Sequence, residues 1–146
     1  MGHHVEQTFT DQEKKKIAGR IHKILERIDG ISPYEVVMMR HELPCIFLKD
    51  AMCMIYEVRP AVCRTCTSTD AEHCKMIHES GNHRAWLKCY QQIREIFQTV
   101  HARLVDHYRE MGCQTDALPL PEAVKDYFRH PEPIEAWLLG EIVFNS

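Results

Sequence analysis

Apolar residues recur at helical spacing near the start of the chain and predict an amphipathic helix. Thr10, with Glu13 three residues later, forms the capping box that begins such a helix, and Gly30 supplies a stop. The repeating apolar positions between them are Ile17, Ile21, Ile24, Leu25 and Ile28.

A second, shorter helix is predicted directly after the first. Ser32 is a suitable N-cap, a proline fits the first helical position after it, and Glu35 completes the cap. The helix should run to about His41 and end before Pro44, because a residue that precedes proline avoids helical geometry. The two helices together account for residues 10–42.

The helical period disappears between residues 44 and 67. Pro44 and Pro60 interrupt this stretch, and its apolar residues fall in two short runs, 46–48 and 54–56. We predict irregular backbone here, with short extended pieces. Helical signals then return in residues 68–79, so residues 44–79 form one cysteine-rich segment.

Four more helices are predicted beyond residue 67. Thr69 and Glu72 frame a third capping box, and a Ser-Gly-Asn sequence ends that short helix. Pro121 and Pro133 each begin a short helix in the C-terminal region, residues 119–144. The longest helix is expected at residues 83–111, with an apolar face formed by Trp86, Tyr90, Ile93, Phe97, Val100, Leu104, Tyr108 and Met111.

This pattern predicts a mainly α, small single-domain protein spanning residues 1–146, with an irregular cysteine-rich loop. Its 146 residues are 45% hydrophobic and 27% charged, an ordinary globular balance. The net charge of −3 gives no basic footprint, so we expect no nucleic-acid partner. No apolar stretch could span a bilayer or act as a secretory signal, so we expect a cytoplasmic protein with no membrane partner. His3 and His4 receive no role.

The cysteine count changes this ordinary picture. The chain has seven cysteines, an odd number, which together with the missing export signal argues against a disulfide framework. The cytosol keeps thiols reduced, and a reduced thiol cluster is more often a metal site or a redox site. Five of the cysteines fall close together, at Cys45, Cys53, Cys63, Cys66 and Cys74.

A thiolate site on irregular backbone has a physical reason. The sulfurs must reach one centre from different directions, and the metal–sulfur bonds then replace the packing that the loop lacks. Cys63-Arg64-Thr65-Cys66 has the spacing of a metal knuckle, but structural zinc sites usually show two such pairs. Iron–sulfur clusters tolerate wider spacings and favour apolar cover, so an iron–sulfur cluster, taken as [4Fe–4S], is slightly preferred to Zn²⁺. The covering residues would be Ile46, Phe47, Leu48, Ile55 and Tyr56.

Two plainer readings stay open. The clustered cysteines could be buried core residues, as we expect for Cys89 and Cys113, although five in one aperiodic segment are hard to explain that way. In the second reading, Cys66 is a bystander next to a site made by Cys45, Cys53, Cys63 and Cys74.

Specific sequence strings surround these cysteines. They are Pro44-Cys45-Ile46-Phe47-Leu48, Cys53-Met54-Ile55-Tyr56-Glu57-Val58-Arg59-Pro60 and Cys63-Arg64. They resemble the signature of the YkgJ-like cysteine-cluster proteins, described as zinc- or iron-chelating domains. The resemblance extends over roughly residues 40–144, with a following Ser68, Asp70 and Cys74 and similar C-terminal helices. It implies a metal site.

The chain departs from that family upstream of the signature. Relatives usually carry an earlier cluster near Cys-x-x-Cys-x-x-Cys-Cys, whereas no residue between Gly2 and Pro44 is a cysteine. Cys66, His73 or His78 could replace the missing ligands.

Arg59, Arg64 and Tyr56 are candidates for residues that surround the ligands. A guanidinium near several thiolates would offset their charge and lower their pKa. The alternative, which we favour, is a salt bridge to Glu57, Asp70 or Glu72 that fixes the loop. Tyr56 is expected in the core or beside the ligands, with its hydroxyl hydrogen-bonded.

Three functions compete. The leading hypothesis is a non-catalytic or accessory metalloprotein, because no substrate site is recognisable. The second is an oxidoreductase-like enzyme or a sensor that uses the cluster, or the dithiol of Cys63 and Cys66. The third is an interaction module folded by metal, whose protein partner is acidic and meets the basic face of the first helix. We expect that face to be simply solvated; it consists of Lys14, Lys15, Lys16, Arg20, Lys23 and Arg27.

Overall fold

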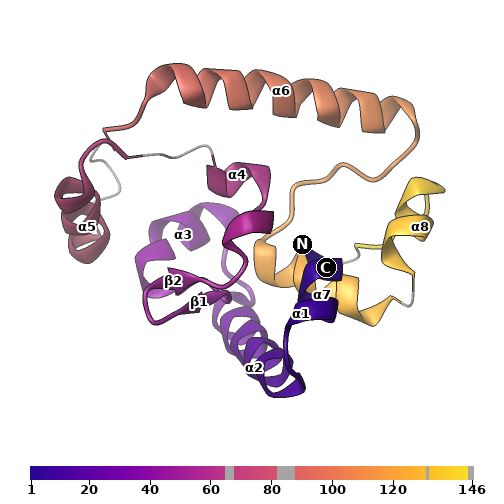
Figure 1. Ribbon diagram of the computed structural model, residues 1–146, viewed down its shortest axis with the longest axis horizontal. Coiled ribbons are helices and arrows are strands. Elements are labelled where there is room, and N and C mark those ends of the chain that lie inside the picture. The colour runs from indigo at the N-terminus through magenta and orange to yellow at the C-terminus, as the bar shows by residue number, and fades with distance from the viewer. Residues whose placement is uncertain (65–67, 82–87, 131, 145–146) are drawn as a thin grey trace.

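The computed structural model describes residues 1–64, 68–81, 88–130 and 132–144 (Figure 1). Within these ranges helices dominate and the β-structure is one small hairpin, which confirms the mainly α prediction. The elements are α1 (Gly2–Thr8), α2 (Asp11–Ile28), α3 (Pro33–Met38), the 3-10 helix η1 (Arg40–Glu42), β1 (Leu48–Lys49), β2 (Met52–Cys53), the 3-10 helix η2 (Tyr56–Val58), α4 (Ala61–Arg64), α5 (Ala71–Ser80), α6 (Gln91–Glu110), α7 (Leu120–Arg129) and α8 (Pro133–Leu138).

The core forms where α2 and α7 pack together and the cysteine-rich segment closes over them. The predicted apolar face of α2 is buried at its centre, as the helical period requires. Burial of this apolar surface is the main driving force for folding. The cluster consists of Val5, Ile17, Ile21, Ile46, Phe47, Ile55 and Val124.

Helix α1 was not expected from the sequence. Its seven residues are too few to show a periodic pattern, yet Val5 is 1% exposed and belongs to the core. The helix approaches α7 so closely that a Cβ at Gly2 would lie 2.3 Å from the ring of Tyr127. The segment that holds His3 and His4 is therefore a structural part of the protein.

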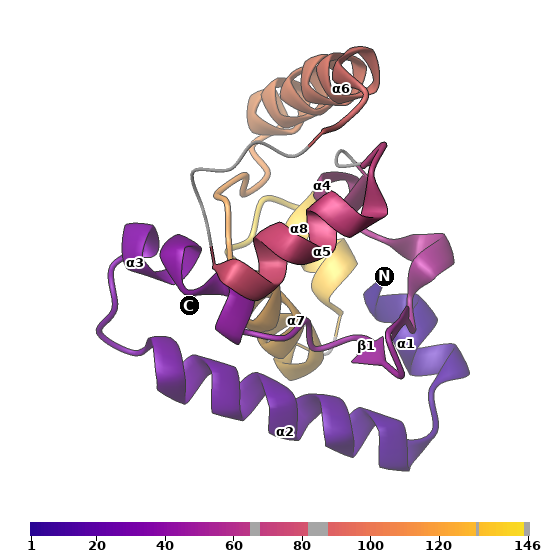
Figure 2. The same ribbon diagram turned by 90° about the vertical axis from the view of Figure 1, so that its left-hand side faces the viewer.

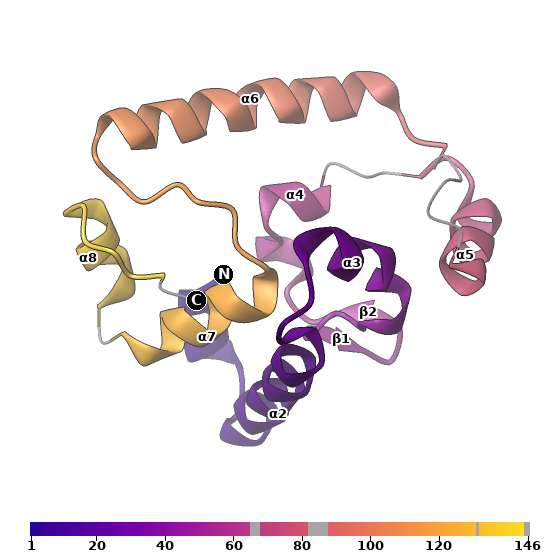
Figure 3. The ribbon, with the colours of Figure 1, turned by 180° about the vertical axis from the view of Figure 1, so that it is seen from behind.

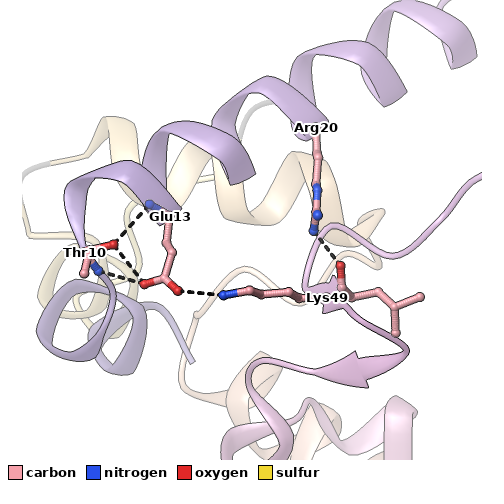
Figure 4. A network of polar contacts seen from close by, with 5 residues as sticks. Thr10, Glu13, Arg20 and Lys49 are labelled. Atoms are coloured by element: carbon pink, nitrogen blue, oxygen red, sulfur yellow. Dashed lines mark hydrogen bonds and ion pairs between the residues drawn. The ribbon is translucent and has the colours of Figure 1, made fainter.

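The predicted capping boxes of α2 and α3 are present, with Thr10 paired with Glu13 and Ser32 paired with Glu35. Glu13 has a second task, because its carboxylate also receives Lys49 Nζ of β1 at 3.4 Å (Figure 4). The start of α2 is thereby tied to the hairpin.

Two predictions beyond the hairpin were wrong in detail. Asp70, rather than Thr69, caps α5, since its carboxylate accepts from the backbone N–H of His73. The long helix begins at Gln91 instead of residue 83: Lys88 and Cys89 are extended because they pair with the backbone of residues 68 and 69. Residues 82–87, which include Trp86 and His83, lie outside the described ranges.

Helix α6 crosses one side of the molecule, well separated from α2 and the hairpin in two perpendicular views (Figures 1 and 2). Near its C-terminal end the ring of Tyr108 stacks on Trp137 of α8, with 4.8 Å between centroids. The indole N–H of Trp137 donates to the carbonyl of Gln114, which fixes the chain that leaves α6. Among the described residues, no helix is both long enough and apolar enough to cross a membrane.

Acid should weaken the link between Glu13, Thr10 and Lys49. Hydrogen bonds from Thr10, helped by Lys49, hold the pKa of Glu13 below its ordinary value. A lowered carboxyl pKa stabilises the fold above the pKa of the unfolded state and loses this effect as the pH falls through the folded-state value. Urea unfolding from pH 3 to 7 should show wild type more stable than Glu13→Gln at neutral pH, with the difference shrinking below about pH 4. A difference in the free energy of unfolding that stays constant down to pH 3 would contradict this prediction.

Candidate metal centre

The cysteine-rich segment is held to the helices by three buried apolar residues. Ile46, Phe47 and Ile55 are buried in the core, while Cys45 beside them is exposed. Of the five residues predicted to cover a cluster, these three are therefore core anchors, and Leu48 and Tyr56 face solvent. Burial of such side chains fixes a backbone that has little regular structure of its own.

Arg20 of α2 also holds this segment, through hydrogen bonds to its backbone. Its guanidinium donates to the carbonyls of Ile46, at 2.9 Å, and Leu48, at 2.7 Å. Figure 4 shows Arg20 extending from α2 toward the strand that carries Lys49. The expectation that Arg20 belongs to a solvated basic face is therefore wrong. Arg20 lies one turn from both Ile17 and Ile24, so a position at the border of the apolar face was the available signal.

The predicted extended pieces are β1 and β2, which pair antiparallel with Leu48 opposite Cys53. Asp50 and Ala51 form the connecting turn, and both have positive φ, 50° and 61°. Two-residue hairpin turns of this kind need left-handed backbone at both positions. The turn reverses the chain and brings Cys53 back beside the Cys45–Leu48 turn.

Cys63 lies on α4, whose position is set by Arg64. The Arg64 guanidinium donates to the carbonyls of Arg59, at 3.2 Å, and Glu57. These hydrogen bonds fold residues 57–64 into a compact turn. Arg64 therefore fixes this turn through backbone carbonyls, whereas we expected a salt bridge to a carboxylate.

The structure gathers three of the predicted thiols, Cys45, Cys53 and Cys63. Burial raises the pKa of the Cys63 thiol above its ordinary value, and negative charge on Cys45 and then Cys53 raises it further. Arg59 acts in the opposite direction. Thiols that influence one another in this way are neighbours, although they come from a loop, a strand and a helix.

The three thiols are neighbours, but their side chains are not arranged around a single metal position. Over the residues that the structure describes, no three His, Cys, Asp or Glu side chains are arranged so that they could hold one ion. Cys45, Cys53 and Cys63 carry free thiols. Binding of a metal would therefore require the sulfurs to draw closer.

The other two predicted ligands are placed differently. Cys74 is half-buried on α5, which lies to one side of α4 (Figures 1 and 3). The C-terminal end of α5 is set by η1: Gly81 has a φ of 62°, and a Cβ there would lie 3.0 Å from the His41 ring. Cys66 lies outside the described residues.

Arg59 is the cation closest to this chemistry. Its guanidinium lies over the ring of Tyr56, 4.0 Å from the centroid, and its buried Nε has no hydrogen-bond acceptor among the described residues. Tyr56 is 61% exposed, so the expectation that it belongs to the core was wrong. The aromatic face holds Arg59 in place, and an unsatisfied buried donor favours an anionic acceptor.

An apolar hollow of about 210 Å³ adjoins Cys45. Part of its wall is residues 119–121, which lead into α7. The remaining lining residues are Ile24, Ile28, Val36, Leu43, Pro44 and Ile46. One side of the thiol group is therefore next to apolar surface.

Comparison with known families gives one match. Residues 3–95, more than half of the chain, match the model of the CxxCxxCC family, described as a putative zinc- or iron-chelating domain. The matched range contains all the predicted cysteine ligands and ends before the C-terminal helices. No curated protein and no solved structure matches the chain.

A substitution in the hairpin turn beside Cys53 should make the protein more stable. Ala51 has left-handed backbone, which costs an L-residue about 1 kcal/mol that glycine does not incur. We expect Ala51→Gly to raise the free energy of unfolding by about 0.5–1 kcal/mol. The matched control is Ala18→Gly within α2, which should lower it by about 1 kcal/mol. Equal losses in both variants, measured by urea denaturation, would contradict the turn geometry.

Proposed function

Because this chain belongs to the CxxCxxCC family of zinc- or iron-chelating domains, we propose that it binds its metal through Cys45, Cys53 and Cys63. Cys66 and Cys74 are candidates for completing the ligand set. We propose a structural or accessory role for the metal. The observation that carries this proposal is the gathering of three thiols from separate elements beside one arginine.

The electrostatics of the thiol group favour a bound cation. Burial and like charge make it costly to ionise Cys63 while Cys45 and Cys53 are also thiolates. A metal cation removes this cost because each thiolate then gains an opposite charge. Metal binding and the shape of the loop are thermodynamically linked in such sites, so the binding free energy also stabilises the fold.

The surroundings of the thiols fit a negatively charged metal–thiolate group. The buried Nε–H of Arg59 lacks an acceptor, and a thiolate or a sulfide would supply one. The hollow at Cys45 places apolar surface on one side of the thiols. When bound, the metal group would cross-link the loop, the hairpin and α4.

We propose an iron–sulfur cluster in preference to Zn²⁺. Its support is the irregular spacing of the cysteines and the apolar lining next to Cys45. Both groups suit thiolate ligands, so chemical analysis has to decide between them. We further propose a reducing, cytoplasmic location, in which the cysteines stay available as ligands.

The redox alternative has less support. Reactive thiols in disulfide exchange have lowered pKa values, often at helix N-termini. The pKa of Cys63 is instead raised, which reduces its thiolate fraction at neutral pH. The third hypothesis is weakened as well, because Arg20 and Arg27 of the basic face are engaged within the chain, with backbone carbonyls and with Glu42.

Anaerobic purification followed by metal and sulfide analysis tests the proposal. We expect iron with sulfide and broad visible absorbance, or one colourless zinc per chain if the zinc alternative holds. Cys45→Ala, Cys53→Ala and Cys63→Ala should each lose most of the metal. The matched control is Cys113→Ala, a buried cysteine far along the chain, which should keep it. Full metal content in all four variants would refute the assigned ligands, and Cys66→Ala and Cys74→Ala identify the remaining one.

Arg59 should strengthen metal binding through its charge. We expect Arg59→Gln to weaken the affinity for Zn²⁺ or Co²⁺ about tenfold in competition with a chromogenic chelator. Arg59→Lys should recover part of the loss because it keeps the positive charge. Arg103→Gln on the exposed surface of α6 serves as the control and should have no effect. An unchanged affinity in Arg59→Gln would remove Arg59 from the site.

A further inference from the structure

Helix α6 has an apolar face with no partner in the described structure. None of its residues is buried, although the helix is 20 residues long and strongly amphipathic. Ile96 is 63% exposed and Val100 is 52% exposed, and both belong to a continuous stripe. The other strongly exposed members of the stripe are Ile93, Leu104 and Met111. Such a stripe normally faces the interior of a protein or a partner.

The ends of α6 explain why it does not pack against its own chain. Before the helix, Lys88 is held by Thr69, whose backbone N–H donates to its carbonyl at 2.7 Å, and by an ion pair to Asp70 at 2.9 Å. Near the end of the helix, the ring of Tyr108 packs at a tilt against Trp137 of α8. These two attachments lie far apart, so α6 bridges them and stands away from the core (Figures 1 and 2).

The exposed area is too large for a compact monomer. A folded monomer of 17.1 kDa is expected to expose about 7,800 Å². This chain exposes 10,633 Å², roughly 2,800 Å² more, summed over all of its surface. Obligate homodimers bury about 1,000–2,500 Å² on each subunit, so the chain has enough excess surface for a dimer interface that includes the α6 stripe.

We propose that the apolar face of α6 docks against a second copy of this chain and makes a two-fold symmetric dimer. A stripe that runs the whole length of one helix can pack against its own symmetry mate, because both copies present the same surface. The charges on α6 also suit self-association. Its three arginines are balanced by three acidic residues, so two copies do not repel each other and neither an acidic nor a basic partner is preferred.

Sedimentation velocity of the full chain tests this inference. We expect wild type to sediment as a dimer in the micromolar range, whether or not metal is bound. Val100→Glu and Ile96→Glu each place a charge on the stripe and should weaken dimerisation at least tenfold. The control Gln98→Glu adds the same charge on the opposite side of the helix and should leave the dimer intact. A monomeric wild type, or dimerisation that is equal in Val100→Glu and Gln98→Glu, would overturn the proposal.

A measurement on wild type alone covers the case in which the variants fail to fold. Hydrogen exchange of the α6 amides should slow as the protein concentration rises, because association protects the helix. The amides of α2 serve as an internal reference, since their helix packs within the chain. Exchange in α6 that is slow and independent of concentration would mean that the helix packs on its own chain, and the dimer would be refuted.

Discussion

The burial of Ile46 and Phe47 is the constraint on which the site depends. These two side chains enter the core formed by α2 and α7, and they carry a segment that has almost no regular structure. Cys45 precedes them and is left at the surface. The hydrogen bonds from Arg20 to the carbonyls of the same segment then fix its backbone, so the hairpin and α4 leave from a defined position.

From that anchor, local geometry brings the thiols together. The tight turn at Asp50 and Ala51 returns the chain with Cys53, and the hydrogen bonds of Arg64 shape the turn that carries Cys63. Arg59 lies over an aromatic ring among them with an unused buried donor. The result is a group of thiols whose mutual repulsion a cation would relieve, next to a residue that suits an anionic metal–thiolate group.

Local signals predicted much of the fold. The capping boxes at Thr10 and Ser32 fixed the starts of two helices, because the hydrogen bonds involved span only three residues. The same reasoning was wrong at Thr69, where the hydroxyl donates instead to the carbonyl of Lys88, a contact nineteen residues away. Helix α1 was missed because its stability comes from burying Val5 against other elements rather than from its own pattern.

The sequence by itself determined the helical class, most helix boundaries and the family, since all of these depend on residues close together in the chain. It also named the cysteines but not their arrangement. Only the tertiary structure placed Cys53 and Cys63 near Cys45 and showed that the predicted helix with Cys74 lies to one side of α4. It alone showed that Arg20 donates hydrogen bonds to the cysteine-rich segment. It also showed that the apolar stripe of α6 packs against no other part of the described structure. The physical reason is that these features depend on contacts between residues distant in the chain, which a local pattern cannot specify.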